Sequence, residues 1–176
     1  DQGGYGFEDL AEKLAFQTYV FSEEDGTFFG DPRAEKGGTL NYIHTNFPRT
    51  MRIIGQNSSQ MINSRIIQAL CYESLLGQHP ATLEFVPSLA THWYISDDKR
   101  TFKFRINPDA RWSDGRPVIA DDIVAIWDLR MDETILMPSE QLSFGKFERP
   151  VAESKYIVSV RSKSINWRNF LYFSTM

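Results

Sequence analysis

Three carboxylates, two tryptophans and two arginines lie close together in the stretch ARWSDGRPVIADDIVAIW, which runs from Ala110 to Trp127. Glycoside hydrolases use a pair of carboxyl groups that lie ~5 to 9.5 Å apart across the scissile bond. Asp114 and either Asp121 or Asp122 are near enough in sequence to reach such a separation. One hypothesis is therefore a fragment of a carbohydrate-active hydrolase that uses Asp114 with Asp121 or Asp122.

The same aspartates also have a structural interpretation. Asp121 and Asp122 follow Pro117 and directly precede an apolar stripe with helical spacing. Carboxylates at such a position accept hydrogen bonds from unpaired backbone N–H groups and face the positive end of the helix dipole. The spacing predicts a helix that begins near Ala120 and is capped by one of the two. The Ser-Asp-Gly sequence at 113–115 is typical of a tight turn. We favour this interpretation and assign no catalytic residue.

The other groups that could do chemistry are scattered along the chain. His44, His79 and His92 are distant in sequence from one another and from the single cysteine, Cys71. Metal sites usually show such ligands at short, regular spacing, so we predict no metal and no cofactor. The sequence also has no nucleophile elbow, phosphate-binding glycine loop or HExxH motif. Cys71 lies in an apolar helical pattern, where we expect it to be buried as a small hydrophobic residue.

Composition and charge narrow the class of protein. Of the 176 residues, 41% are hydrophobic and 24% are charged, which is typical of a globular domain. The 19 basic and 23 acidic residues are mixed along the chain, so we expect no nucleic-acid partner, which would require a clustered basic surface. No apolar run approaches the ~18 residues of a membrane span. The first residues lack the order of a signal peptide, so either the protein is cytosolic or an export signal has been removed.

Periodicity and turn residues predict the order of elements. Residues 1–36 are rich in glycine and acidic residues and indicate a loosely packed arm, in which only 8–19 have helical content. The elements expected after the arm are a strand at 39–45, a helix from 58 to 77, an extended segment at 83–88, the helix near 120, a strand at 156–160 and a helix starting at 167. A strand and helix left open near Met176 would indicate a truncated chain.

A β-hairpin is predicted over residues 93–106, around the polar turn at 97–100. Large apolar residues alternate with basic ones in the second strand, as expected of a sheet with one buried face. We expect Phe102, Phe104 and Ile106 to be buried, and Lys103 and Arg105 to face water.

The order of several short motifs resembles one known family. The motifs are YESLL at 72–76 and FVPSLATHWYISDDKRTFKFRINPDARWSDGRPVIADDIV at 85–124. Together they match a helix ending in Tyr-Glu-x-Leu, a Pro-x-Leu-Ala-x-x-Trp strand, a Ser-Asp-Asp turn, a Phe-x-Phe strand and a Trp-x-Asp-Gly-x-Pro motif. They resemble the extracellular solute-binding proteins of family 5, the oligopeptide-, dipeptide- and nickel-binding components of ABC importers. KGGTL at 36–40 is similar to the family's entry into its first strand.

The resemblance implies an α/β fold of the type II periplasmic binding-protein class, with a mixed β-sheet and flanking helices. Residues 1–36 would be an N-terminal arm, and 37–176 the N-terminal part of the first lobe of a larger two-lobed protein, including the lobe's inserted subdomain. The implied function is not enzymatic. A monomer at the periplasmic or extracellular face of the membrane would close around a peptide or similar small solute and deliver it to a membrane permease driven by an ATPase.

Two polar and aromatic clusters are candidates for ligand contact in such a protein. Binding lobes use loops at strand ends for this purpose, although an ordinary strand end and ordinary surface packing explain the clusters equally well. The candidate residues are Tyr42, His44, Thr45, Asn46 and Phe47 in the first cluster, and Trp167, Arg168 and Asn169 in the second. A non-transport signalling or interaction module on the same fold remains a further alternative.

Overall fold

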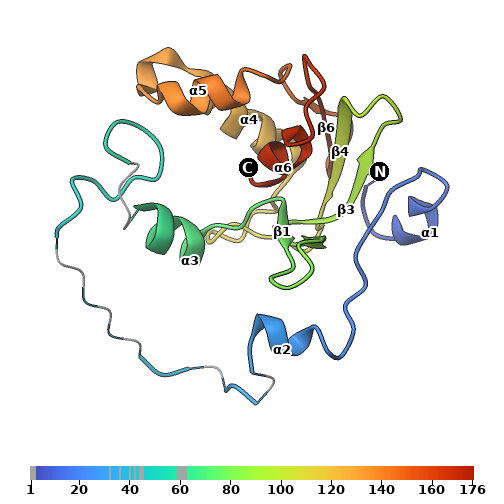
Figure 1. Cartoon of the computed structure of the whole chain (residues 1–176), viewed down its shortest axis with the longest axis horizontal. Coiled ribbons are helices and arrows are strands. Elements are labelled where there is room, and N and C mark those ends of the chain that lie inside the picture. Colours follow the sequence, from blue (N-terminus) through green and yellow to red (C-terminus); the bar gives the residue numbers. More distant parts are fainter. Residues whose placement is uncertain are drawn as a thin grey trace.

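A four-stranded antiparallel sheet lies at the centre of the molecule (Figure 1). The computed structural model describes residues 3–31, 33–35, 37–39, 41, 43, 46–58 and 63–176. The sheet has the order β3 (Ala90–Ile95), β4 (Thr101–Ile106), β6 (Ile157–Arg161) and β5 (Val151–Ala152). Every described strand pair is antiparallel. The mixed sheet of parallel and antiparallel strands that the resemblance implies is therefore not seen among the described strands.

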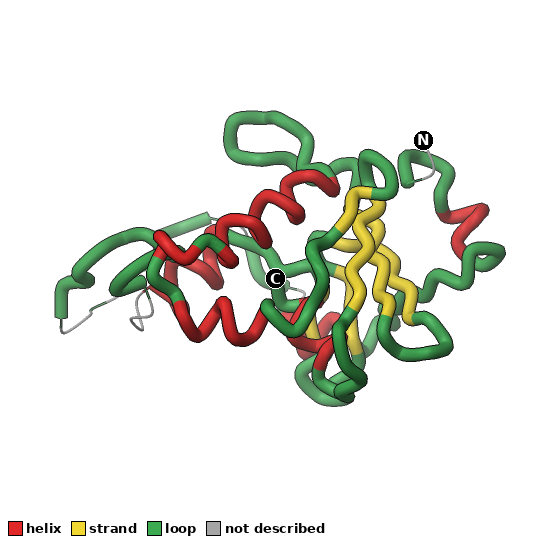
Figure 2. The backbone as a smooth tube through the Cα atoms, turned by 90° about the horizontal axis from the view of Figure 1, so that it is seen from above, coloured by secondary structure: helices red, strands yellow, loops and turns green. Residues whose placement is uncertain are grey.

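The predicted hairpin is formed by β3 and β4, which pair with Trp93 opposite Phe104. Phe102, Phe104 and Ile106 are buried as the alternation predicted. They face the helices α4 (Ala120–Met131), α5 (Pro138–Phe144) and α6 (Asn169–Ser174), which lie on one side of the sheet (Figure 2). A short 3-10 helix, η2 (Glu133–Ile135), joins α4 to α5. The expected helices near 120 and 167 and the expected strand at 156–160 are therefore confirmed.

The opposite face of the sheet is covered by residues 3–17, which include α1 (Glu8–Ala11) (Figure 2). Phe7 and Ala11 are buried against Ile157 of β6, and Phe16 packs beside them. Gln17 forms an isolated antiparallel bridge with Trp93 at the edge of β3. The hairpin therefore has apolar contacts on both faces rather than one wet face.

Arg105 corrects the prediction for this hairpin, because its side chain is only 2% exposed. Its guanidinium group donates from Nε to the Gly3 carbonyl and from Nη2 to the Gly4 carbonyl, both at 2.8 Å. The Nη1 atom bonds Thr91 and lies 3.0 Å from a Glu8 carboxylate oxygen. Charged groups are buried when such partners compensate their desolvation. The prediction was wrong because these partners come from a segment about 100 residues earlier in the chain.

A second, two-stranded sheet is formed by β1 (Leu76–Gln78) and β2 (Phe85–Pro87). The segment that includes α2 (Gly26–Phe29) lies against its turn. There His79 is buried and its Nε2 atom lies 3.3 Å from an Asp25 carboxylate oxygen. The Nδ1 atom of His79 accepts hydrogen bonds from the backbone N–H groups of Ala81 and Thr82. His79 therefore has a structural role, because it stabilises the turn between β1 and β2.

The helix predicted from 58 to 77 is shorter than expected. It consists of η1 (Asn63–Gln68), a π-helix, and α3 (Ala69–Cys71), and the chain becomes extended at Tyr72. Cys71 is exposed, which contradicts its expected burial. The physical reason is that α3 lies at the margin of the packed region (Figure 1), where Leu70 is also 78% exposed.

Two remaining expectations concern the N-terminal half and the membrane. Within the strand predicted at 39–45, Leu40, Tyr42, His44 and Thr45 lie outside the described residues, and Thr39, Asn41 and Ile43 are not part of a strand. Of the described helices, none has the length and apolar content that a bilayer crossing requires.

Candidate functional site

The stretch from Ala110 to Trp127 forms a loop and the start of α4. Asp122 lies in the first turn of α4, and its Oδ2 atom accepts a hydrogen bond of 2.9 Å from the backbone N–H of Ile119, the residue before the helix. The same oxygen accepts a bond of 3.1 Å from the indole N–H of Trp112. Asp122 thus caps the helix, as predicted, and also fixes the Trp112 ring. Asp121 is exposed in the same turn.

Asp114 occupies the predicted tight turn, in which Gly115 has a φ of +87°. Its carboxylate accepts hydrogen bonds from the backbone N–H and the Nε of Arg116, at 3.0 and 2.8 Å. The backbone bond and then the guanidinium bond keep the pKa of Asp114 below its usual value. A general acid needs a raised pKa instead. The contacts of Asp114 and Asp122 therefore give both carboxylates a structural role, in a turn and at a helix start.

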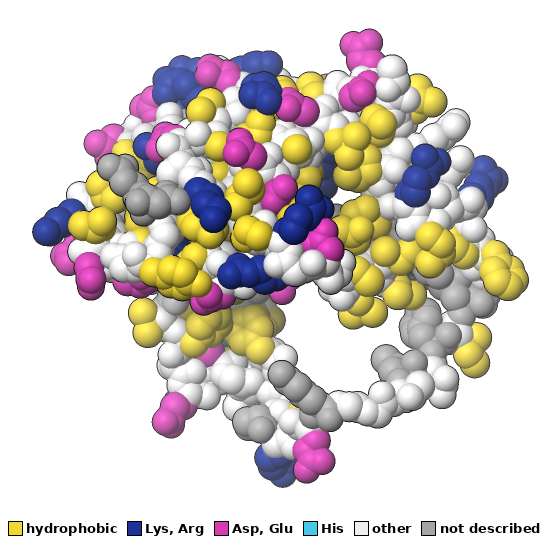
Figure 3. All heavy atoms as spheres, turned by 180° about the vertical axis from the view of Figure 1, so that it is seen from behind, with side chains coloured by type: hydrophobic (Ala, Val, Ile, Leu, Met, Phe, Trp, Pro, Cys, Tyr) yellow, Lys and Arg dark blue, Asp and Glu magenta, His cyan; other side chains and the backbone are white. Residues whose placement is uncertain are grey.

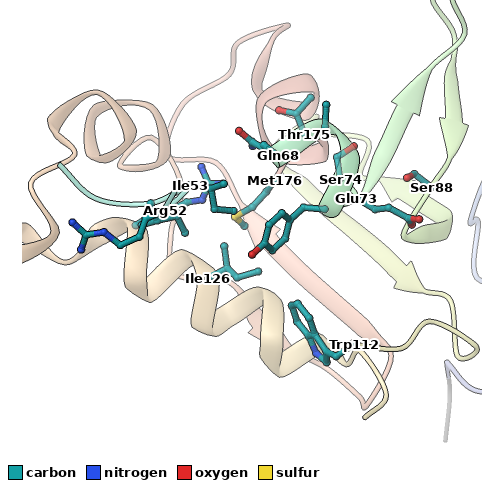
Figure 4. Close-up of a pocket in the computed structure, with 14 residues that line it drawn as sticks. Arg52, Ile53, Gln68, Glu73, Ser74, Ser88, Trp112, Ile126, Thr175 and Met176 are labelled. Atoms are coloured by element: carbon teal, nitrogen blue, oxygen red, sulfur yellow. The ribbon is translucent and has the colours of Figure 1, made fainter. Parts of the chain in front are cut away.

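A cavity of about 790 Å³ opens beside α4 (Figure 4). Its walls come from six parts of the chain: a loop in the N-terminal half, the region of η1 and α3 with the residues that follow, the connection between β2 and β3, the loop before α4, α4 itself and the C-terminal residues. The lining residues are Arg52, Ile53, Ile54, Gln68, Ala69, Tyr72, Glu73, Ser74, Ser88, Trp112, Ile126, Arg130, Thr175 and Met176. Its volume lies in the ~300 to 1,000 Å³ range of small-molecule sites.

The chemistry of the cavity is mixed. Ile126 projects from α4 and Trp112 from the preceding loop toward the same space, which Met176 closes from another side (Figure 4). The polar side chains that line it carry hydroxyls, one carboxylate, one amide and two guanidinium groups. Arg130 packs over the Phe144 ring at 4.9 Å and forms an ion pair with Glu140, so its side chain is held in place. An apolar wall with a few polar groups suits an amphipathic organic ligand.

Backbone hydrogen bonds hold the central wall of the cavity. The N–H of Leu75 donates to the Met176 carbonyl at 3.1 Å, and the N–H of Leu89 donates to the Ser74 carbonyl at 3.1 Å. The segment after α3 is thereby fixed between the C-terminal residues and the start of β3. The loop at 52–54 is joined to the α4–α5 connection, because the N–H of Gly55 lies 2.9 Å from the sulfur of Met137.

Of the residues predicted to contact a ligand, the ones that the structure describes are Asn46, Phe47, Trp167, Arg168 and Asn169, and none of these lines the cavity. Tyr42, His44 and Thr45 lie outside the described residues. Asn46 and Phe47 are exposed, and Phe47 is exposed completely, in the chain that leads to the lining residues at 52–54.

The second predicted cluster lies at the other end of α6. Trp167 is 79% exposed and stacks with the Arg168 guanidinium at 4.6 Å. Asn169 is buried and donates from Nδ2 to the Ser164 carbonyl. Trp167 and Arg168 precede α6 and Asn169 is its first residue, whereas the cavity is lined by Thr175 and Met176 beyond its last turn. Among the described residues, the members of the two predicted clusters therefore do not line one common cavity, and ligand contact by either cluster stays a prediction.

Sequence reasoning did not select Tyr72 or Trp112 as candidates for ligand contact, although both line the cavity. Tyr72 is the first residue of the YESLL motif, which indicated the family, and Trp112 is the first residue of WSDG, which indicated a turn. A cavity assembled from distant segments has no periodic signal in the sequence. No group of three or more His, Cys, Asp or Glu side chains able to hold a metal occurs within the described part of the chain.

Sequence comparison relates the chain to known binding proteins. It is 29% identical over 101 residues to a probable ABC transporter-binding protein of Deinococcus radiodurans, covering 57% of this chain and 16% of that protein. It is 39% identical over 67 residues to the periplasmic murein peptide-binding protein MppA of Escherichia coli, covering 38% of this chain and 12% of that protein. The chain thus spans less than a fifth of these relatives.

Solved structures share the fold. The oligopeptide-binding protein OppA of Haemophilus influenzae, in complex with the peptide RPPGFSPFR, superposes with a TM-score of 0.51 at 24% identity. That match covers 58% of this chain and 23% of the other. NikA of Brucella suis, in complex with Fe(III)-EDTA, gives a TM-score of 0.51 at 20% identity, covering 62% of this chain and 22% of the other.

A sequence model of one family matches residues 84–176, from the start of β2 to Met176 and more than half of the chain. The matching region contains the hairpin, the WSDG turn and the helices that cover the sheet. Motif order, fold and this match to the model described as bacterial extracellular solute-binding proteins, family 5 Middle, agree, and the chain belongs to the bacterial extracellular solute-binding proteins of family 5.

Proposed function

We propose that this chain is part of the substrate-binding component of an ABC importer. The component captures a peptide or similar small solute and delivers it to a membrane permease that works with an ATPase. Family membership and the peptide-binding relatives support this proposal. The observation that carries it is the cavity beside α4, whose apolar wall and polar margin suit a peptide, which has apolar side chains and polar backbone groups.

In the proposed protein, residues 37–176 form the N-terminal part of the first lobe, and a second lobe closes over the ligand. Several large apolar side chains are exposed on the N-terminal half and near α3. They include Ile43, Phe47, Met51, Leu70 and Tyr72. Exposed apolar patches of this kind mark surfaces that another part of a protein covers. We propose that the remainder of the first lobe covers part of them, and that the closing lobe and ligand cover the rest.

Within the cavity, we propose that Tyr72 and Trp112 provide aromatic surfaces for the ligand. Their rings can pack against apolar side chains, and the hydrogen bond to Asp122 already orients the Trp112 indole. The segment from Tyr42 to Phe47 remains a proposed second contact, because the same stretch of chain leads to the lining residues at 52–54. The proposed protein acts as a monomer in the periplasm or at the extracellular face of the membrane.

The binding experiment is calorimetric titration of the full-length protein with a mixed peptide library. Tyr72→Ala should weaken binding by about tenfold, equivalent to ~1.4 kcal/mol, because an aromatic contact is lost. Trp167→Ala is the matched control at the other end of α6 and should leave the affinity unchanged. If Trp167→Ala weakened peptide binding and Tyr72→Ala did not, the ligand site would instead lie at residues 167–169. If neither variant changed the affinity, the cavity assignment would be refuted.

Two further measurements separate the alternative functions. Asp114→Asn should leave solute binding unchanged in a binding protein, whereas a hydrolase would lose turnover of its carbohydrate substrate. Genes for a permease pair and an ATPase beside the coding gene, with solute uptake that depends on this protein, would support transport. Binding of a protein partner without solute uptake would instead support a signalling module on the same fold.

A further inference from the structure

A basic corner with two protruding apolar side chains lies at one end of the four-stranded sheet. It is formed by the β3–β4 turn, the end of β6, the loop at 163–168 and residues 146–148, which follow α5. Its basic residues are Lys99, Arg100, Lys146, Arg161, Lys163 and Arg168, and its acidic residues are Asp97, Asp98 and Glu148. The corner is thus net positive, although the whole chain has a formal charge of −4.

Hydrogen bonds show that these segments are neighbours. Arg100 donates from Nε to the Ser162 carbonyl at 3.1 Å and from Nη2 to the Lys163 carbonyl at 3.0 Å. The N–H of Lys163 donates to the Lys146 carbonyl at 2.8 Å. Asp98 accepts a hydrogen bond from Arg161 and pairs with it at 3.1 Å. Figure 3 shows several Lys and Arg side chains along the upper edge of the molecule, interspersed with Asp and Glu side chains.

The loop at 163–168 carries the apolar part of the corner. All six of its residues are exposed, and the side chains of Ile165 and Trp167 are 72% and 79% exposed. The loop is nevertheless anchored, because Asn169 and Ser162 both bond the Ser164 carbonyl. Arg168 stacks on the Trp167 ring, so a cation lies directly beside the larger apolar side chain. The loop therefore presents an ordered apolar tip surrounded by basic groups.

We propose that this corner binds the surface of a membrane that contains anionic lipids. Tryptophan is favoured at the membrane interface because its ring is apolar and its N–H can meet polar headgroups. Lysine and arginine near the surface are attracted to anionic headgroups. Insertion of two side chains into a fluid interface requires no shape-matched pocket, whereas a stable protein partner needs at least ~1,000 Å² of complementary surface. A six-residue tip offers less than that.

This role goes beyond the capture of a solute and does not depend on the ligand cavity, which lies at the other end of α6. It assigns Trp167 and Arg168 to membrane contact rather than to ligand contact. A binding protein held at the membrane surface would meet a membrane-embedded partner more often than one that diffuses freely.

The test is cosedimentation of the chain with vesicles. One set contains equal parts of phosphatidylglycerol and phosphatidylcholine, and the other contains phosphatidylcholine alone. We expect binding to the anionic vesicles, weakened by salt, and little binding to the neutral ones. Trp167→Ala and Arg168→Glu should each reduce the partition coefficient, and the double variant should reduce it by at least about tenfold.

Control variants reverse a positive charge or remove an exposed apolar side chain elsewhere. Lys13→Glu changes the charge equally on the N-terminal segment, and Val20→Ala removes an apolar side chain that is 83% exposed. Both should bind anionic vesicles like the unaltered chain, and circular dichroism should show that every variant is folded. Three results would overturn the proposal: no binding to anionic vesicles, equal binding to neutral vesicles, or losses in the controls that match those at the corner. An acidic protein partner would be the next hypothesis after the first of these.

Discussion

At the scale of single residues, Asp122 connects a helix to the loop before it. One carboxylate oxygen accepts hydrogen bonds from the Ile119 backbone and from the Trp112 indole. Removal of the carboxylate leaves both donors without this partner while the surrounding structure remains packed. The WSDG motif and the start of α4 therefore depend on each other, which explains why tryptophan and aspartate occur ten residues apart.

We predict that Asp122→Ala lowers the free energy of unfolding by about 1 to 3 kcal/mol, because two partly buried donors lose their acceptor. Asp121→Ala is the matched control, since Asp121 is exposed in the same helical turn and contributes mainly through the helix dipole, about 0.5 kcal/mol. Urea denaturation followed by tryptophan fluorescence measures both values. Equal losses in the two variants would show that the dipole, rather than the shared hydrogen bonds, explains the role of Asp122.

Arg105 leads to a second prediction at this scale. Arg105→Met removes the donor for two buried carbonyl groups, and we expect a loss of about 2 to 3 kcal/mol. The loss cannot exceed the free energy with which residues 3–17 pack on the sheet. If that segment detaches, water can hydrate the carbonyl groups that Arg105 no longer bonds. Limited proteolysis should accordingly cut the variant first within this segment.

Arg161→Met provides the comparison for Arg105. Its side chain and that of Asp98 are each more than 40% exposed, so the ion pair contributes only about 0 to 1 kcal/mol. If residues 3–17 of the Arg105→Met variant resisted the protease as well as those of the unaltered chain, Arg105 would not be what holds this segment on the sheet.

Asp122 and Arg105 also show what sequence can predict for single residues. The role of Asp122 as a cap follows from neighbours within three residues, so local spacing is sufficient to predict it. Arg105 depends on carbonyl groups that are separated from it by about 100 residues, and no local pattern reveals such a partner. The alternation of apolar and basic residues in β4 correctly placed Arg105 on the face opposite Phe104. It did not reveal that residues 3–17 cover that face.

At the scale of elements, the β3–β4 hairpin is the part of the fold with the strongest local signal. Phe104→Ala should lower the free energy of unfolding by about 3 to 5 kcal/mol, because the ring packs against Phe170 and Phe173 and no side chain can fill the space. Lys103→Ala, at the next position and paired with Glu153, should cost at most about 1 kcal/mol. Thermal and urea unfolding give both values, and similar losses would mean that the assigned register is wrong.

The helix expected from 58 to 77 shows where element prediction failed. Apolar residues recur there at helical spacing, but Leu70 and Cys71 are exposed and the chain becomes extended at Tyr72. Periodicity identifies an apolar stripe without showing what packs against it. Because Ala69 and Leu70 of this stripe are exposed in the described structure, packing does not stabilise a long helix there.

At the scale of the whole molecule, the described residues form one side of the proposed site, and the second lobe is proposed to form the other. The family was predictable from ordered motifs, because each motif is a local turn or strand signal. The cavity was not predictable, since it brings residues 52–54 next to α4 and the C-terminal residues. Such a site is determined by how distant segments pack rather than by any single motif.

The last prediction concerns binding by this chain alone. Good pockets bury ~70 to 90% of a ligand's surface, and a cavity that lacks the proposed second lobe cannot do so. The entropy lost when a flexible peptide is immobilised would then be poorly offset. We therefore expect the chain to fold, as shown by a cooperative thermal transition, but to bind peptides no more tightly than about 1 mM. Calorimetric titration with a mixed peptide library tests this, with the full-length protein as the reference that binds tightly. Micromolar binding by the chain alone would contradict the two-lobe proposal and indicate a complete site within these 176 residues.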